Sequence, residues 1–281
     1  MWHFPDPRRC LIVPALIATA FVSTALLADP VFDLQPNPYW QVELHAKSEE
    51  LLAQREADAR KADAFGCRRY CELLADTFAR VLRVATYQVP DSAAHDWQLV
   101  VTRMPGDEAW SLPDGHIFIS EDFIQRNRFS ADEVAFVISH EISHVVLAHE
   151  ADMVDIVRRL VPFGVSASVS DVYATLDFDM GLLLRIAPLM SDMELEADRT
   201  GLMFAALAGY DPDRTTGFLR KLAAGSQRTA VVATHPQDRQ RLTEAEHYLP
   251  FARRLYALHD ALARPDRPFN PAPDAIANLS R

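Results

Sequence analysis

Ser139-His140-Glu141-Ile142-Ser143-His144 is the stretch that decides how this chain is interpreted. On an α-helix, four residues correspond to about 400° of rotation and about 6 Å of rise, so His140 and His144 project from nearly the same stripe. Both imidazoles can therefore bind one metal ion, and Glu141 can reach a water molecule bound to that ion. The spacing predicts two zinc ligands and a general base on one helix, as in a metal-dependent hydrolase.

The surroundings of this stretch predict a buried helix. Apolar side chains occupy most of its sides: Val134, Phe136, Val137, Ile138, Ile142, Val145, Val146 and Leu147. Ser130 and Glu133 have the spacing of a capping box that begins the helix. The alternative is a surface helix carrying two histidines satisfied by other contacts. Because burying two unpaired imidazoles costs free energy that a bound metal ion would offset, the apolar surroundings favour the metal site.

The third ligand must come from another segment. In one class of metallohydrolase the helix continues to a glycine three residues and a histidine six residues after the second ligand, but Leu147 and Glu150 occupy these positions. His149 is nine residues past His140, about 900° of rotation. We therefore expect His149 on the opposite face of the helix, as a solvent-exposed or C-terminal-turn residue.

Glu194 is the predicted third ligand, on a helix expected from about Asp192 to Leu207. Asp198, one turn later, is expected to accept the free N–H of a ligand histidine, His140. Glu196 faces another direction and is the alternative ligand.

The Glu-x-x-x-Asp spacing is weak evidence by itself. It occurs a second time at Glu72 and Asp76, which we interpret as a solvated helix face. Ser191 to Glu194 also fits a capping box. The mostly apolar helix that continues after Asp198 favours ligation.

Together these segments resemble metallopeptidase family forty-eight, over roughly residues 60 to 245. The resemblance is carried by ordered motifs: His140-Glu141-x-x-His144, Glu194-x-Glu196-Ala197-Asp198-Arg199-Thr200-Gly201, Gly209-Tyr210-Asp211-Pro212, Thr234-His235-Pro236 and Arg239. It implies a zincin-like fold with one zinc ion per chain. The implied ligands are His140, His144 and Glu194, and the implied catalytic base is Glu141.

The resemblance also implies roles for His235 and Arg239. His235 is expected near the metal, either occupying the open fourth position as a gate or stabilising the oxyanion that develops during hydrolysis. The alternative is a histidine of a helix N-cap region, held by Thr234 and Pro236. Arg239 is expected to support the site from outside the ligands, as Asp198 does. The sequence departs from the family pattern at Asp192, where relatives often have Arg, and at Asp114, where a second Gly often follows the Pro.

The predicted fold class is α+β, mainly helical, with a small antiparallel sheet over the metal-binding helix. Strands are expected at about Gln98–Arg103 and Gly115–Ser120. We expect the second strand at an edge of the sheet, where a substrate can add to it as a further strand. This substrate edge strand contains His116, Ile117, Phe118 and Ile119.

Helical periodicity predicts an exposed helix over 41–64, a core-facing helix over Arg68–Tyr87 and a final helix over Asp238–Ala263. Residues 160–190 are apolar but interrupted by charges, so they are too broken to span a bilayer and could shield the site or touch a membrane surface. The predicted organisation is a signal peptide or anchor at 1–28, a linker and exposed helix at 29–65, a zinc metalloprotease domain at 66–263 and a Pro-rich disordered tail at 264–281.

Residues 1–28 are typical of an export signal. Arg8 and Arg9 precede an uncharged stretch from Cys10 to Ala28. We expect cleavage and a periplasmic mature chain. The alternative is an inner-membrane anchor formed by residues 11–28.

The mature chain would hold two cysteines, Cys67 and Cys71. Within a helix, an i,i+4 pair has Cα atoms about 6 Å apart and side-chain vectors that need distortion to form a bridge. A strained disulfide near the helix start and two buried thiols are therefore both open. A metal role has no further partners nearby.

Composition limits the function classes. A chain of 281 residues with 49% hydrophobic content is sufficient for one domain of about 200 residues plus flanking helices. The net charge of -11 and the lack of a basic patch predict no nucleic-acid partner.

The expected function is a zinc-dependent endopeptidase that acts on unfolded or misassembled envelope proteins in extended conformation. Membrane-surface or outer-membrane assembly partners are further candidates. The alternative is a periplasmic chaperone or assembly factor whose zinc site is structural or silenced. The complete set of ligands and base favours the enzyme, because a structural zinc site has no need of Glu141 beside an open fourth position.

Overall fold

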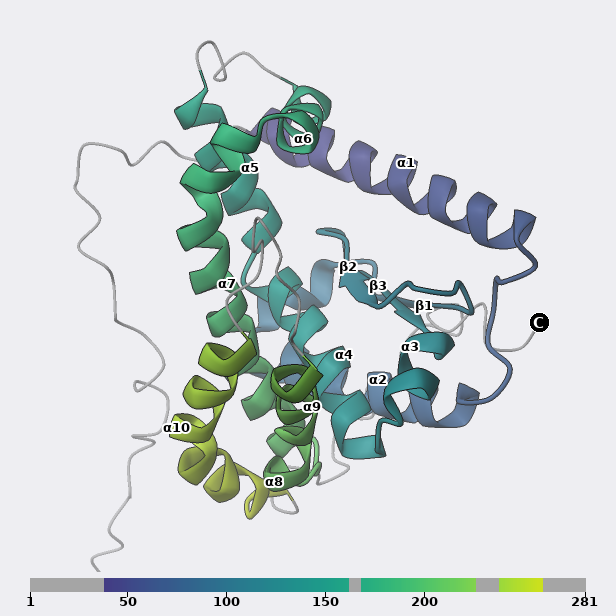
Figure 1. The fold of residues 1–281 in the computed structure, drawn as a ribbon, viewed down its shortest axis with the longest axis vertical. Coiled ribbons are helices and arrows are strands. Elements are labelled where there is room, and N and C mark those ends of the chain that lie inside the picture. Colours follow the sequence, from purple (N-terminus) through teal and green to yellow (C-terminus); the bar gives the residue numbers. More distant parts are fainter. Residues whose placement is uncertain (1–37, 162–167, 226–237, 260–281) are drawn as a thin grey trace, which may run out of the picture. The chain divides into compact units, whose positions relative to one another are not determined.

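The computed structural model describes residues 38–161, 168–225 and 238–259, in a compact unit that begins at Pro38 (Figure 1). The strands are β1 (Gln98–Thr102), β2 (Ala109–Ser111) and β3 (His116–Ser120). The helices are α1 (Pro38–Lys61), α2 (Cys71–Gln88), the short 3-10 helix η2 (Pro90–Ala94), α3 (Glu121–Asn127), α4 (Ala131–Val146), α5 (His149–Leu160), α6 (Val169–Phe178), α7 (Met180–Leu207), α8 (Pro212–Thr215), α9 (Gly217–Gly225) and α10 (Asp238–Tyr256). The α+β class and the mainly helical content are confirmed.

The sheet is mixed, so the prediction of an antiparallel sheet was wrong. Its strand order is β1-β3-β2, with β1 and β3 parallel and β2 and β3 antiparallel. The short strand β2 was not predicted, and it forms a hairpin with β3. The turn of this hairpin is held by Leu112, whose N–H donates to the carbonyl of His116, and by Gly115 at φ +109°. Because β2 reverses the chain between β1 and β3, β1 and β3 run in the same direction.

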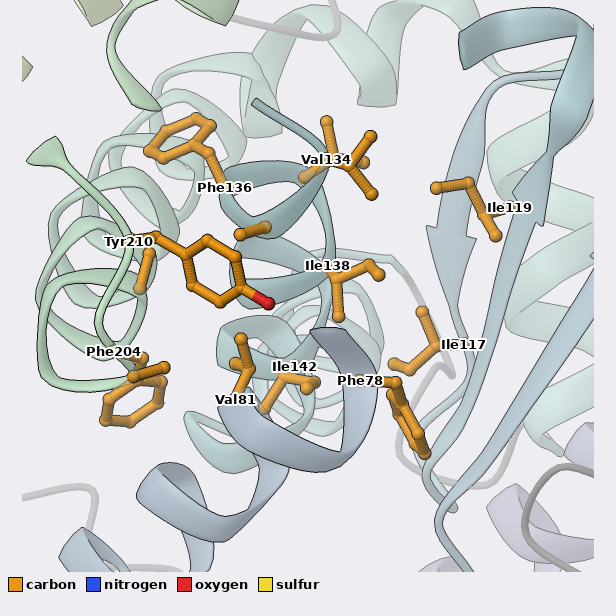
Figure 2. Close-up of a cluster of buried hydrophobic side chains, with 14 of the residues drawn as sticks. Phe78, Val81, Ile117, Ile119, Val134, Phe136, Ile138, Ile142, Phe204 and Tyr210 are labelled. Atoms are coloured by element: carbon orange, nitrogen blue, oxygen red, sulfur yellow. The ribbon is translucent and has the colours of Figure 1, made fainter. Parts of the chain in front are cut away.

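Each face of the sheet packs against different helices. Ile117 and Ile119 lie with Leu99 and Val101 in the main core, which they share with α2, α4 and α7 (Figure 2). Val100, Leu112 and Phe118 form a smaller cluster that Leu51 and Leu52 of α1 cover. The helix α1, predicted to be exposed, therefore has a buried stripe as well.

The central helix α4 is buried along almost its whole length. Ser130 caps it as predicted, because its side chain accepts the N–H of Glu133 and the Glu133 carboxylate accepts the N–H of Ser130. Val134, Ile138 and Ile142 are fully buried between the sheet, α2 and α7. Such burial fixes the rotation of α4, and with it the direction of the two histidines.

The helix α7 begins twelve residues before its predicted start at Asp192. Asp179 caps it by accepting the N–H of Leu182, and the helix continues through Pro188. Ser191 to Glu194 is therefore helix interior and not a cap. The first half of α7 forms a second apolar cluster with α5 and α6. None of the described helices is both long enough and apolar enough to cross a bilayer.

Cys67 and Cys71 form a disulfide, with their Cα atoms 5.6 Å apart. Four residues of this segment precede α2, which begins at Cys71 and not at Arg68 as predicted. The bridge therefore closes a loop at the helix start, and the helix itself needs no distortion.

Candidate metal centre

Three side chains converge between α4 and α7. His140 Nε2 and His144 Nε2 lie 3.0 Å apart, and the carboxylate oxygens of Glu194 lie 3.5 Å and 3.6 Å from them. Two ligands about 2.1 Å from one zinc ion at a tetrahedral angle are separated by about 3.4 Å. The three distances bracket this value, and His140 and Glu194 are buried. The donor set of two imidazoles and one carboxylate therefore fits a zinc ion in chemistry and in size.

Gly201 allows α7 to approach α4 closely enough to bring these donors together. A Cβ at this position would lie 2.8 Å from the backbone nitrogen of His140 and 3.0 Å from its Cα. Gly201 follows Glu194 by seven residues, two turns of the helix, and so lies on the same face. The two helices therefore approach each other closely at the first predicted metal ligand, His140.

Asp198 and Arg241 hold the ligands from outside. Asp198 Oδ1 lies 3.0 Å from Nδ1 of His140, as predicted. Arg241 donates to both oxygens of Asp198, at 2.7 Å and 2.6 Å, and lies 3.3 Å from Glu194. Burial would raise the pKa of Asp198, but Arg241 and His140 hold it below its usual range. One arginine thus fixes a ligand carboxylate and the carboxylate that orients a ligand histidine.

Arg239 does not have the supporting position predicted for it. It is exposed at the start of α10, while Arg241 is buried and points at the site. Two residues on a helix differ by about 200°, so only one of the two arginines can face α7. The sequence motif alone could not show which arginine faces α7.

The two ligand histidines have opposite proton affinities. Burial lowers the pKa of His140, but hydrogen bonds and charges from Asp198 and Glu194 outweigh it and raise this pKa to about 10. Burial and then the charge on His140 lower the pKa of His144 to about 3. At neutral pH His140 therefore carries one proton more than a neutral imidazole while His144 is neutral, and a cation that binds here must displace that extra proton.

Glu141 lies next to the first ligand and is buried. Ser111 Oγ, from strand β2, donates a hydrogen bond to Glu141 Oε2 at 3.1 Å. Burial raises the pKa of Glu141, which is the direction expected for a carboxylate that accepts and returns a proton. Ser111 was missed by the sequence reasoning because the three-residue strand that carries it gives no clear periodic signal.

His149 is not on the opposite, exposed face as predicted. Ala148 adopts a left-handed conformation at φ 57° and ends the helical path of α4, so that α5 begins at His149. The ring of His149 is buried, and its Nδ1 lies 3.0 Å from Nδ1 of His144. The prediction assumed a continuous helix, and an alanine with a left-handed backbone conformation cannot be recognised from the sequence.

The remaining predicted residues have different outcomes. His116, Ile117, Phe118 and Ile119 are buried in β3, the central strand, so the prediction of a substrate edge strand there was wrong. The edge nearest Glu141 is β2. His235 lies outside the described residues, and its role as gate or oxyanion partner stays a prediction.

A second cluster, formed by Cys67, Cys71 and Glu121, does not have the chemistry of a metal site. Its sulfurs are joined in the disulfide and are not thiolates. Glu121 Oε1 accepts the backbone N–H groups of Arg68, Arg69 and Tyr70, at 3.0, 2.7 and 3.0 Å. This carboxylate therefore orders the disulfide loop.

The chain has recognisable relatives. The sequence pattern of Peptidase family M48 matches residues 72–249, more than half of the chain. The mitochondrial metalloendopeptidase OMA1 of Schizosaccharomyces pombe is 32% identical over 165 residues, which cover 56% of this chain and 48% of that protein. The β-barrel assembly-enhancing protease of Yersinia pestis is 32% identical over 130 residues, 41% of this chain and 27% of that protein. The chain thus spans about half or less of these relatives. It belongs to peptidase family M48.

Proposed function

We propose that this protein is a zinc-dependent endopeptidase that binds one zinc ion through His140, His144 and Glu194. The observation that carries the proposal is the convergence of these three donors at tetrahedral spacing, 3.0 to 3.6 Å apart, beside a buried carboxylate. When bound, zinc supplies a Lewis acid that acidifies a water molecule and polarises the scissile carbonyl.

Glu141 is the general base in this proposal. Its carboxylate accepts the proton of the attacking water and then passes it to the nitrogen of the leaving amine. The hydroxyl of Ser111 holds one carboxylate oxygen at 3.1 Å, which limits the orientations of the base. The raised pKa of Glu141 brings proton acceptance and release closer in energy at neutral pH.

The substrate in this proposal is an extended polypeptide that pairs with β2. Among the described strands, β2 pairs with β3 on one side and has no strand partner on the other. A chain added along that free side would pass close to Ser111, and so to Glu141. Because main-chain pairing recognises an extended conformation more than a sequence, unfolded or misassembled proteins are the proposed substrates. The signal-like residues 1–28 support an envelope location, and the similarity to a β-barrel assembly-enhancing protease supports outer-membrane assembly partners.

The test is Glu141→Gln in the purified protein, with unfolded casein as substrate. We expect the variant to keep its zinc content and melting temperature and to lose about 10²- to 10⁴-fold in kcat, because only the proton-transfer group is removed. The matched control is Glu108→Gln, which removes an exposed carboxylate from the segment before β2 and should leave kcat unchanged. Casein cleavage at the wild-type rate by Glu141→Gln would contradict the mechanism. A wild-type protein that suppresses aggregation but cleaves nothing would favour the assembly-factor alternative.

A further inference from the structure

The two ligand histidines are supported by different groups on their outer nitrogens. His140 has the carboxylate of Asp198 at its Nδ1, whereas His144 has another imidazole, that of His149, with the two Nδ1 atoms 3.0 Å apart. The ring of His149 lies edge-on to that of His144, with centroids 4.9 Å apart and planes at 79°. This geometry points one in-plane nitrogen at another, as in a directed hydrogen bond.

The contact determines where the hydrogens lie once His144 binds metal. Its Nε2 faces Glu194 and His140, so metal binding there leaves the proton of the neutral ring on Nδ1. That N–H can be satisfied only by an acceptor, so Nδ1 of His149 carries a lone pair and its Nε2 carries the proton. His149 Nε2 in turn lies 3.7 Å from Oε2 of Glu196, a favourable contact between an N–H dipole and a carboxylate.

We propose that His149 is a positioning residue that fixes the ring of His144 for metal binding, and that Glu196 orients His149. On α7, Glu196 is about 200° from Glu194, so it faces α5 while the ligand faces α4. In the Glu194-x-Glu196-x-Asp198 segment, Glu194 is then the ligand, Asp198 orients His140, and Glu196 orients His144 through His149. This inference rests on the proposed zinc site but is independent of peptide hydrolysis.

The first test is the tautomer of His149, read from nitrogen-15 histidine spectra of the zinc-loaded full chain. We expect the ring of His149 to be protonated at Nε2 and bare at Nδ1, with Nδ1 of His144 protonated. A His149 ring protonated at Nδ1 in the loaded protein would overturn the proposal. Wild type that takes up no zinc would instead contradict the proposed function, so the two failures are distinguishable.

The second test is zinc affinity, measured by competition with a chromophoric chelator. His149→Phe keeps a ring but removes the acceptor, and we expect a loss of about 10- to 100-fold. His149→Gln offers an amide oxygen to the same N–H and should recover most of that loss. Glu196→Gln, at an exposed side chain, should lower the affinity by a smaller factor. The control is His95→Phe, at a half-buried histidine whose ring packs against Trp97, and it should bind zinc as wild type does.

Equal zinc affinity in His149→Phe and wild type would overturn the proposal. So would an equal loss in His149→Phe and His149→Gln, because packing alone would then explain the effect. If His149→Phe does not fold, two other results decide. Protonation of His149 at Nδ1 in the zinc-loaded wild type would exclude His149 from the proposed arrangement. Wild-type zinc affinity in Glu196→Gln would exclude Glu196.

Discussion

Replacing Gly201 with alanine should separate the two helices that carry the proposed metal ligands. The added Cβ would lie 2.8 Å from the nitrogen of His140, 3.0 Å from its Cα and 3.0 Å from the carbonyl carbon of Ser139. All three are backbone atoms inside a buried helix, so none can rotate away. To reach the 3.4 Å at which ordinary contact begins, the helices must part by about 0.6 Å along the closest line.

The cost of this separation follows from two opposing effects. Overpacking costs about 1–3 kcal/mol, while alanine is favoured over glycine inside a helix by about 1 kcal/mol. We therefore expect a net loss of stability of up to about 2 kcal/mol. Zinc affinity should fall about tenfold or more. Metal sites tolerate deviations of only about 0.2 Å in their ligand distances, and the steric overlap is at His140 itself.

The assay is zinc affinity by chelator competition, together with the melting temperature of the metal-free protein. Gly181→Ala is the matched control, because Gly181 is in the same helix and its new Cβ would meet only a side-chain oxygen of Asp179, at 3.2 Å. That variant should bind zinc normally. If Gly201→Ala kept both the affinity and the melting temperature of the wild type, the close approach would not be what aligns the ligands.

Three further outcomes are expected. Arg241→Ala should destabilise the fold by about 3–5 kcal/mol, because it leaves a buried carboxylate unpaired, whereas Arg239→Ala should change stability by less than about 0.5 kcal/mol in urea unfolding. Equal destabilisation by the two substitutions would mean that Arg239 supports the site after all. Zinc affinity should rise about tenfold per pH unit up to about pH 10, because the raised pKa of His140 keeps a proton on the metal-free site that zinc must displace. The same proton stabilises the metal-free fold fully below pH 6.5, and this stabilisation is lost between pH 6.5 and about 10. A zinc affinity that does not change with pH below about pH 10 would contradict a protonated His140 in the metal-free site. Ser111→Ala should lower kcat about tenfold at unchanged zinc content, since Glu141 loses a hydrogen bond worth about 1.5 kcal/mol. Loss of zinc in this variant would mean that Ser111 supports the ligands instead.

The parts of the site that were predictable from sequence are those set by local geometry. His140, Glu141 and His144 lie within one helix, so the period of 3.6 residues fixes their relative directions, and the capping box at Ser130 fixes where the helix begins. Asp198 follows Glu194 by one turn, and the same period places it behind the ligand.

The errors arose where distant segments or unusual backbone conformations decide the structure. The pairing direction of the sheet depends on β2, three residues long and without a distinct pattern, so the edge strand was assigned to β3. The position of His149 depends on the left-handed conformation of Ala148. Because this residue is not a glycine, the sequence gives no signal of that conformation. Choosing between Arg239 and Arg241 needs the rotation of α10 against α7, which is a tertiary contact.

The positions of Glu141 and Ser111 indicate why a sheet is needed beside the ligand helix at all. The ligands come from α4 and α7, and their outer supports come from α5, α7 and α10, so the zinc site could be assembled without a strand. The proposed base, Glu141, contacts the sheet through Ser111 of β2. A substrate strand paired with β2 would therefore be positioned by the same element that orients the proton acceptor. In the proposed function, binding an extended chain and directing the attack on it would then be one structural event, and a strand of three residues would determine where a polypeptide is cut.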